Sequence, residues 1–119
     1  ISFIDIKSEQ DRLNFINAFG ISVESEPIET VNTKIPKEFD AVYNEYNNIQ
    51  LAQGLDLSKY KGKKINRFTY KVTNYPTDEN GNPKNVYLNL IVYKNKVIGG
   101  DISSSDGEGF VRTFCDFAG

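Results

Sequence analysis

Apolar residues recur at helical spacing near the start of the chain. Leu13, Ile16 and Phe19 lie three residues apart, so they would share one face of a helix. Ser8 precedes them and can accept hydrogen bonds from the free N–H groups of a first turn, and acidic residues follow it there. The pattern predicts an amphipathic helix over residues 8–20.

A longer helical pattern follows in the second quarter of the chain. Pro36 stands where a first helical turn tolerates proline, and Gly54 provides a stop. Between them, apolar residues form one stripe over three turns: Phe39, Val42, Tyr43, Tyr46 and Ile49. This stripe predicts a second helix, over residues 36–54.

The remaining apolar residues alternate with polar ones, which is the period of a strand. The clearest case is the segment 86–93, in which Val86, Leu88, Leu90 and Val92 would share one face. Turn-forming residues fill 76–83, and a tight hairpin is expected at residues 94–95. The predicted strands are 21–24, 28–31, 67–73, 86–93 and 97–102, with an element of undetermined type over 110–117.

The order of these elements is α-β-β-α-β-β-β within one domain spanning residues 1–119. Connections between consecutive strands are too short for the crossovers that a parallel sheet needs. We therefore expect an α+β fold, an antiparallel β-sheet with two helices packed on one face. If Phe68, Tyr70 and Val72 and the apolar side of 86–93 turn toward the helices, the opposite face of the sheet stays open.

Composition removes several classes of function. The 119 residues are 39% hydrophobic and 25% charged, values that are ordinary for a globular domain. Without His, the chain lacks the commonest general base and metal ligand. Its single cysteine, Cys115, can form no internal disulfide or cysteine-rich zinc site, and we expect it to be a small buried apolar residue. No apolar run reaches the length of a membrane span. We expect no cofactor and no bound metal.

The net charge of −2 conceals a strong segregation. Residues 1–56 carry ten acidic and four basic residues, whereas residues 57–97 carry nine basic and two acidic ones. A basic middle segment can attract a polyanion such as an anionic cell-wall polymer or lipid head groups. Solvated lysines on exposed sheet edges explain the same charges more simply. Because the chain has only three arginines, the residues that bind phosphate bidentately, we expect no nucleic-acid partner.

The sequence contains no methionine and begins at Ile1. We therefore expect a segment ahead of Ile1 that is absent here, such as a tag, a signal peptide or a membrane anchor. Asn, Lys and Ile are abundant, with eleven Lys against three Arg, which indicates A/T-rich codons and a low-GC bacterium.

Asp101 stands directly beside a predicted buried strand, after two glycines that let a backbone or a ligand approach closely. Acid–base catalysis needs two carboxylates with separated pKa values, and no partner acid stands at a readable spacing. Neither acidic loop fits the ligand spacing of an EF-hand, which leaves a loose calcium site from Asp101, Asp106 and Glu108 as the metal alternative. We assign no catalytic residue and no metal ligand.

Aromatic residues on the expected open sheet face are the best candidates for contacts with a partner. Tyrosine offers a large surface and a hydroxyl group at low entropic cost, which suits recognition of a protein or a glycan. The same side chains would also stabilise cross-strand pairs without any ligand. The predicted binding residues are Tyr75, Tyr87, Ile91, Tyr93, Lys71 and Asp101.

Several stretches of the chain together resemble one known family. They include residues 11–20 and 53–64, residues 70–76 with Asn74-Tyr75-Pro76, and residues 97–102 with Gly99-Gly100-Asp101, joined by 92–93 and 109–110. Over nearly its whole length the chain resembles the small bacterial family catalogued as domain of unknown function 4830. Members commonly carry a hydrophobic N-terminal segment, so the resemblance implies a location in the cell envelope. It supports the fold and implies no reaction.

We therefore expect a non-enzymatic, extracytoplasmic binding or accessory module of a bacterial envelope protein, secreted or membrane-anchored as in a lipoprotein, and monomeric. Its partner would be a protein or a cell-envelope glycan, and it would meet a membrane only through a segment ahead of Ile1. Two alternatives remain: an inhibitor-like module that regulates a protease, by analogy of fold alone, and a hydrolase using Asp101 with a remote acid. A pocket with two carboxylates would favour the hydrolase, and a flat aromatic sheet face would favour binding.

Overall fold

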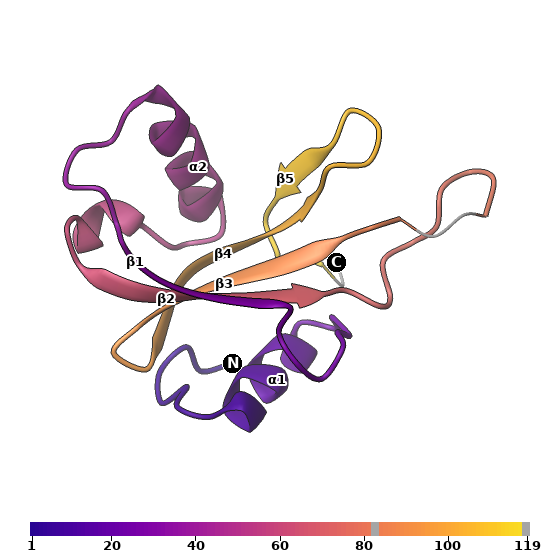
Figure 1. The fold of residues 1–119 in the computed structure, drawn as a ribbon, viewed down its shortest axis with the longest axis horizontal. Coiled ribbons are helices and arrows are strands. Elements are labelled where there is room, and N and C mark those ends of the chain that lie inside the picture. The colour runs from indigo at the N-terminus through magenta and orange to yellow at the C-terminus, as the bar shows by residue number, and fades with distance from the viewer. Residues whose placement is uncertain (82–83, 118–119) are drawn as a thin grey trace.

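A five-stranded antiparallel sheet forms the centre of the molecule (Figure 1). The structure, a computed structural model, describes residues 1–81 and 84–117. The strands follow one another across the sheet in chain order, each antiparallel to its neighbour. They are β1 (Glu29–Lys34), β2 (Lys64–Lys71), β3 (Tyr87–Tyr93), β4 (Lys96–Ser104) and β5 (Phe110–Arg112). The antiparallel sheet predicted from the short connections is confirmed.

The first helix, α1 (Glu9–Ala18), begins where the sequence predicted it. The Ser8 side chain accepts a hydrogen bond from the Asp11 N–H, and the Asp11 carboxylate accepts one from the Ser8 N–H, both at 3.0 Å. Two of the free donors at the helix start are satisfied in this reciprocal way, which fixes the first turn.

The second helix, α2 (Ala41–Ala52), begins later than predicted and is followed by a short 3-10 helix, η1 (Leu57–Tyr60). Asp40 caps α2 by accepting a hydrogen bond from the Tyr43 N–H at 2.8 Å. A carboxylate satisfies a free N–H group of the first turn, whereas proline only tolerates that position. Residues 36–40 therefore form a connection from β1 rather than the start of the helix.

The two α-helices lie on opposite faces of the sheet, α1 on one and α2 with η1 on the other (Figure 1). This corrects the expectation that both pack on one face. The cause is that β3 is apolar on both sides: Leu88 and Leu90 are buried on the α1 face, and Ile91, 4% exposed, is buried on the α2 face. A sheet that is apolar on both faces has to be covered on both.

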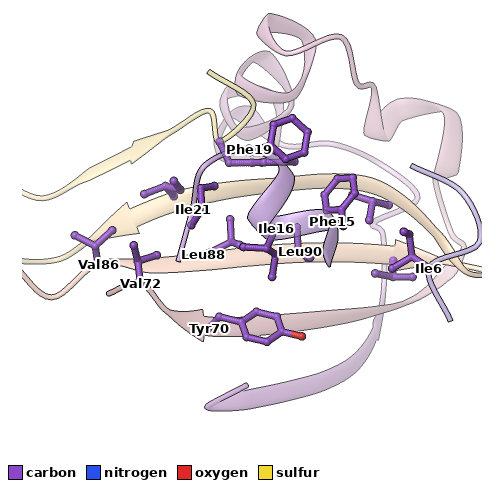
Figure 2. Packing of buried hydrophobic residues seen from close by; sticks show 14 residues of the cluster. Ile6, Phe15, Ile16, Phe19, Ile21, Tyr70, Val72, Val86, Leu88 and Leu90 are labelled. Atoms are coloured by element: carbon purple, nitrogen blue, oxygen red, sulfur yellow. The ribbon is translucent and has the colours of Figure 1, made fainter. Parts of the chain in front are cut away.

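The larger hydrophobic cluster lies between α1 and the sheet, where Phe15 and Ile16 of the helix pack over β3 (Figure 2). Phe19, just after α1, meets Phe114 from the C-terminal segment edge to face, with ring centroids 5.3 Å apart. The smaller cluster lies under α2 and η1 and consists of Ile35, Leu57, Ile65, Ile91 and Ile98. The sheet therefore separates two distinct cores.

Strand boundaries differ from the prediction mainly at the edge of the sheet. β1 extends to Lys34, and the strand predicted over 21–24 is reduced to a single bridge between Val23 and Val72. Residues 110–117 form β5 and a turn. Of the loop predicted over 76–83, residues 82–83 lie outside the described residues, as do 118–119 of the domain. The α+β class is confirmed, and the order of the long elements roughly matches.

Two glutamine side chains at the end of α2 fasten this helix to the edge of β4. β5 pairs only with residues 102–104, so the N–H and C=O of Gly100 point past the end of β5. Gln50 Oε1 accepts a hydrogen bond from the Gly100 N–H at 2.9 Å, and Gln53 Nε2 donates one to the Gly100 carbonyl at 2.9 Å. Gln53 Oε1 also accepts the Phe114 N–H at 2.9 Å. The glutamine pair thus replaces a neighbouring strand.

Gly100 has no room for a side chain. A Cβ atom at this position would lie 2.5 Å from the Asn89 carbonyl oxygen and 3.0 Å from the Phe114 ring. On the other face, a Cβ on Gly99 would lie 2.9 Å from Leu57 Cδ2. The two glycines therefore allow η1 and the C-terminal segment to approach the same stretch of β4 from opposite sides.

We expect Gln53→Ala to lower the free energy of unfolding by about 1–3 kcal/mol, because the Gly100 carbonyl and the Phe114 N–H lose their partner together. Urea denaturation measures this difference. Gln10→Ala is the matched control: Gln10 is exposed and bonds only to Asn14 on its own helix, so its removal should change stability by less than about 0.5 kcal/mol. Equal effects of the two substitutions would contradict a special role for the glutamine pair.

Candidate functional site

A cleft of about 440 Å³ opens on the face of the sheet that carries α2. β1 and β5 contribute Thr33 and Val111 to its lining, and Ile35 and Ile91 contribute apolar surface. Lys34 of β1 also lines it, and the rest of its polar and aromatic lining comes from α2 and the three central strands: Tyr43, Tyr46, Arg67, Asn89, Asp101 and Ser103. Side chains from six different elements therefore converge on one hollow, as in a ligand site.

A chain of hydrogen bonds crosses the floor of this cleft. The Tyr46 hydroxyl donates to Asp101 Oδ1 at 2.5 Å, and Asn89 Nδ2 donates to Asp101 Oδ2 at 3.2 Å. The Thr69 hydroxyl in turn donates to Asn89 Oδ1 at 2.6 Å. Asn89 and Asp101 are direct partners across β3 and β4, so the ladder of the sheet itself sets their geometry.

The position of Tyr46 follows from the way α2 is anchored. Gln50, which bonds to β4, lies one helical turn after Tyr46, so the two side chains point to the same side of the helix. Anchoring Gln50 to the backbone of Gly100 therefore directs the Tyr46 hydroxyl to Asp101, the next residue along β4.

Burial dominates the electrostatics of the Tyr46–Asp101 pair. Asp101 is 4% exposed, and this desolvation raises the pKa of its carboxyl group, against the opposing effect of the hydrogen bonds from Tyr46 and Asn89. Burial and the neighbouring carboxylate together raise the pKa of Tyr46 well above its usual range. A carboxyl group with a raised pKa in a cleft can bind a polar ligand or exchange a proton with it.

Arg67 brings a positive charge to the same cleft. Its Nη2 atom lies 2.5 Å from Glu29 Oε1, an ion pair that is partly open to solvent. The Nε atom of Arg67 is buried and has no hydrogen-bond partner among the described residues. A buried donor without a partner is uncommon in proteins, and a ligand oxygen in the cleft would satisfy it.

The sequence predicted six binding residues, with Tyr87, Ile91, Tyr93 and Lys71 on an open sheet face, and the structure brings two of the six, Ile91 and Asp101, into the cleft. Both are 4% exposed because α2 and η1 cover this half of the face, which corrects the expectation that it is open. Tyr93 packs against Tyr60 of η1 with ring centroids 5.5 Å apart. That end of the predicted surface is therefore used for packing.

Tyr87, Lys71 and Tyr75 lie outside the cleft. Lys71 places its Nζ atom 4.9 Å from the centre of the Tyr87 ring and donates a hydrogen bond to Asn85. Tyr75 stacks on Phe110 and lines a separate hollow of about 660 Å³ between the end of α2 and the C-terminal segment. The structure fixes where these residues lie, and their part in binding stays a prediction.

The hollow beside Tyr75 is larger, yet four of its polar side chains already pair with one another. Arg112 donates a hydrogen bond to the Tyr75 hydroxyl at 2.8 Å, and Thr113 donates one to Asp116 at 2.6 Å. Nearby, burial and then the charge of Asp116 raise the pKa of the Cys115 thiol to about 11. This thiol stays protonated at neutral pH and is a poor nucleophile.

Sequence reasoning missed the contribution of α2 to the site. Tyr43 and Tyr46 fit the apolar stripe of a helix and were assigned to the core for that reason. Ser103 lies two positions after Asp101, which puts both on the same face of β4. This spacing from Asp101 could have identified Ser103. Nothing in the sequence indicated that α2 packs on this face of the sheet.

The described residues hold no group of three or more His, Cys, Asp or Glu side chains that could share a metal ion. The loose calcium site considered for Asp101, Asp106 and Glu108 is therefore not formed among them. Within the part of the chain that the structure covers, no helix has the length and apolarity needed to cross a membrane.

A family model described as "Domain of unknown function (DUF4830)" matches residues 15–102. The match begins inside α1 and ends within β4, so it includes both α2 and the strands that form the floor of the cleft. Comparison with curated proteins and with solved structures gave no significant match.

We expect a carbon-detected NMR titration to show Asp101 releasing its proton at higher pH than the half-buried Asp56, because burial raises the pKa of Asp101, whereas hydrogen bonds from Ser58 and Asn47 lower that of Asp56. Tyr46→Phe removes a donor to the carboxylate and should raise the Asp101 pKa further. A lower pKa in this variant would contradict the assigned geometry.

The same shift has a thermodynamic counterpart. With its folded-state pKa above the unfolded value of about 3.9, Asp101 binds its proton more tightly in the folded protein. Relative to Asp101→Asn, the wild type should lose stability as pH rises from about 4 through the folded-state pKa. Urea denaturation of both proteins over this range tests the sign.

Proposed function

The chain belongs to the DUF4830 family, and from this premise we propose that it is a non-enzymatic binding module whose ligand site is the cleft between α2 and the sheet. The family description names no activity, so the proposal depends on the cleft alone. The observation that carries it is the unpartnered Nε of Arg67 beside the ordered Thr69–Asn89–Asp101–Tyr46 chain. Side chains held in place before binding lose little entropy when a ligand arrives.

The chemistry of the lining favours a hydroxyl-rich ligand, namely a cell-envelope glycan. A sugar hydroxyl both donates and accepts hydrogen bonds, and the cleft offers Arg67 as a donor, Asp101 as an acceptor and Ser103 as both. Tyr43 adds an aromatic ring that can pack against the apolar face of a sugar. A protein partner would meet mainly recessed polar groups here.

A location outside the cytoplasm is part of the same proposal. The chain has a single cysteine, so an oxidising compartment could form no disulfide within the domain, and this supports the location. The fold is held by two hydrophobic clusters and the glutamine pair, so it needs no disulfide in either compartment.

The raised pKa of Asp101 favours a hydrolase as the second candidate function. Glycoside hydrolysis ordinarily needs two carboxyl groups, one on each side of the scissile bond. Asp101 is the one acidic side chain among the described residues that line the cleft, and Glu29 is bound to Arg67 at its margin. Binding is therefore the better-supported function.

We expect soluble peptidoglycan fragments, prepared by muramidase digestion, to shift the backbone NMR signals of Asn89, Asp101 and Ser103 while signals on the α1 face stay in place. Tyr43→Ala should weaken this binding about fivefold, since the ring would supply about 1 kcal/mol. Tyr60→Ala is the matched control, because Tyr60 packs against the same cluster but does not line the cleft.

Equal weakening by both tyrosine substitutions, or shifts spread over both faces of the sheet, would contradict a site in the cleft. Absence of any shift would overturn the glycan as ligand. Slow appearance of cleaved fragments, abolished by Asp101→Asn, would replace the binding module with the hydrolase.

A further inference from the structure

The two edges of the sheet are finished differently. At one edge β5 pairs with residues 102–104, and the glutamine pair occupies the adjoining backbone of Gly100. At the other edge β1 has no neighbour beyond it, and all but one of its residues, Val31, are exposed. An uncovered strand edge is a template for pairing with another strand.

The hydrogen-bond pattern identifies which backbone groups of β1 are free. The Ile35 N–H donates to the Lys63 carbonyl, and bonded positions alternate along an antiparallel pair. The odd-numbered residues of β1 therefore bond to β2, whereas Thr30, Asn32 and Lys34 direct their N–H and C=O groups outward. No hydrogen bond from the described residues reaches these outward groups.

Charge is distributed unevenly along this edge. Glu24, Glu26 and Glu29 lie at or just before the start of β1. At its end, Lys34 stands directly opposite Lys64 of β2, and neither lysine forms an ion pair with a described residue. Like charges opposite one another in a sheet are unfavourable unless something neutralises them. The edge is therefore acidic at one end and basic at the other.

We propose that β1 is a self-association surface, at which two copies of the chain pair β1 antiparallel to β1 across a two-fold axis. With Asn32 opposite Asn32 of the second copy, Thr30 faces Lys34, so all three outward residues of each strand find backbone partners. In this register the acidic end of each β1 lies at the basic end of the other. The two sheets join into one continuous sheet of ten strands.

Charge complementarity favours a second copy over an unrelated extended peptide, because the acidic end and the basic end of the same edge attract each other in an antiparallel pair. Pro27 and Pro36 flank β1 and confine the pairing to its six residues. A two-fold contact of β1 with β1 uses up the edge of both copies, and the strand at the other edge, β5, has only three residues, so association stops at the dimer. Such a short edge buries less surface than a standard interface, and we expect a weak dimer. It replaces the monomer expected from the sequence.

Sedimentation equilibrium over a range of concentrations tests the proposal, with a molar mass approaching twice the 13.5 kDa of the chain as the expected result. Asn32→Pro removes an outward N–H without touching a bond to β2 and should weaken the dimer at least tenfold. A wild-type protein that stays monomeric up to about 1 mM would overturn the proposal.

Charge-reversed variants test the β1–β1 dimer even if Asn32→Pro does not fold. Lys34→Glu/Lys64→Glu and Glu24→Lys/Glu26→Lys should each be monomeric, because both ends of each homodimer would carry like charges. Mixed together they should dimerise, because both ends would again be complementary. Lys94→Glu/Lys96→Glu is the matched control for the lysine variant: it makes the same change in net charge where β3 meets β4, with β2 between it and the β1 edge, and should dimerise as the wild type does.

A dimer that the edge variants leave unchanged would place the interface elsewhere and overturn the proposal. Failure of the two charge-reversed variants to associate when mixed would overturn the two-fold register. None of these outcomes depends on glycan binding, so self-association and the ligand site succeed or fail separately.

Discussion

The bonds between the two glutamines of α2 and the backbone of Gly100 determine how the rest of the molecule is arranged. They attach the helix to the one stretch of β4 that β5 leaves without a partner, and they hold the C-terminal segment at the same point. Satisfying exposed backbone groups of a strand with side chains is uncommon, because most such groups pair with another strand or with water. Here it joins a helix, a strand and the C-terminal segment.

The cleft is a consequence of this attachment. The helix turn that reaches Gly100 also presents Tyr46 to Asp101, and the space between α2, β1 and β5 is what the helix leaves uncovered. Asp101 is thereby buried with a tyrosine and an asparagine as hydrogen-bond partners, and the charge of Arg67 has a smaller effect on its pKa than burial does. The proposed binding site and the stability of the fold thus depend on the same few contacts, which is common where a site lies against a rigid framework.

Much of the fold was readable from local patterns. Alternation over 86–93 and 97–102 identified β3 and β4, and Ser8 correctly marked the start of α1, because those signals arise from neighbours in sequence. The face chosen by α2 was not readable, since Ile91 reads as one apolar residue on a polar side until Leu57 and Ile98 are seen to join it. The two glycines before Asp101 marked it as a candidate because they are its neighbours in sequence. The apolar stripe that contains Tyr46 gave no sign that its hydroxyl reaches Asp101.

The burial of β3 on both faces has a further consequence for strand alignment. In most sheets a slip of one residue exposes the apolar side, so hydrophobicity alone fixes the alignment. A slip of β3 would instead move Leu88 and Leu90 to a face that α2 and η1 also cover, so hydrophobicity alone penalises the slip less. Alignment is then set by features that tolerate no exchange: Gly100, which has no room for a side chain, and the facing pair Asn89 and Asp101. Asn89 and Asp101, which lie in the cleft, therefore also help to fix the register of the strands.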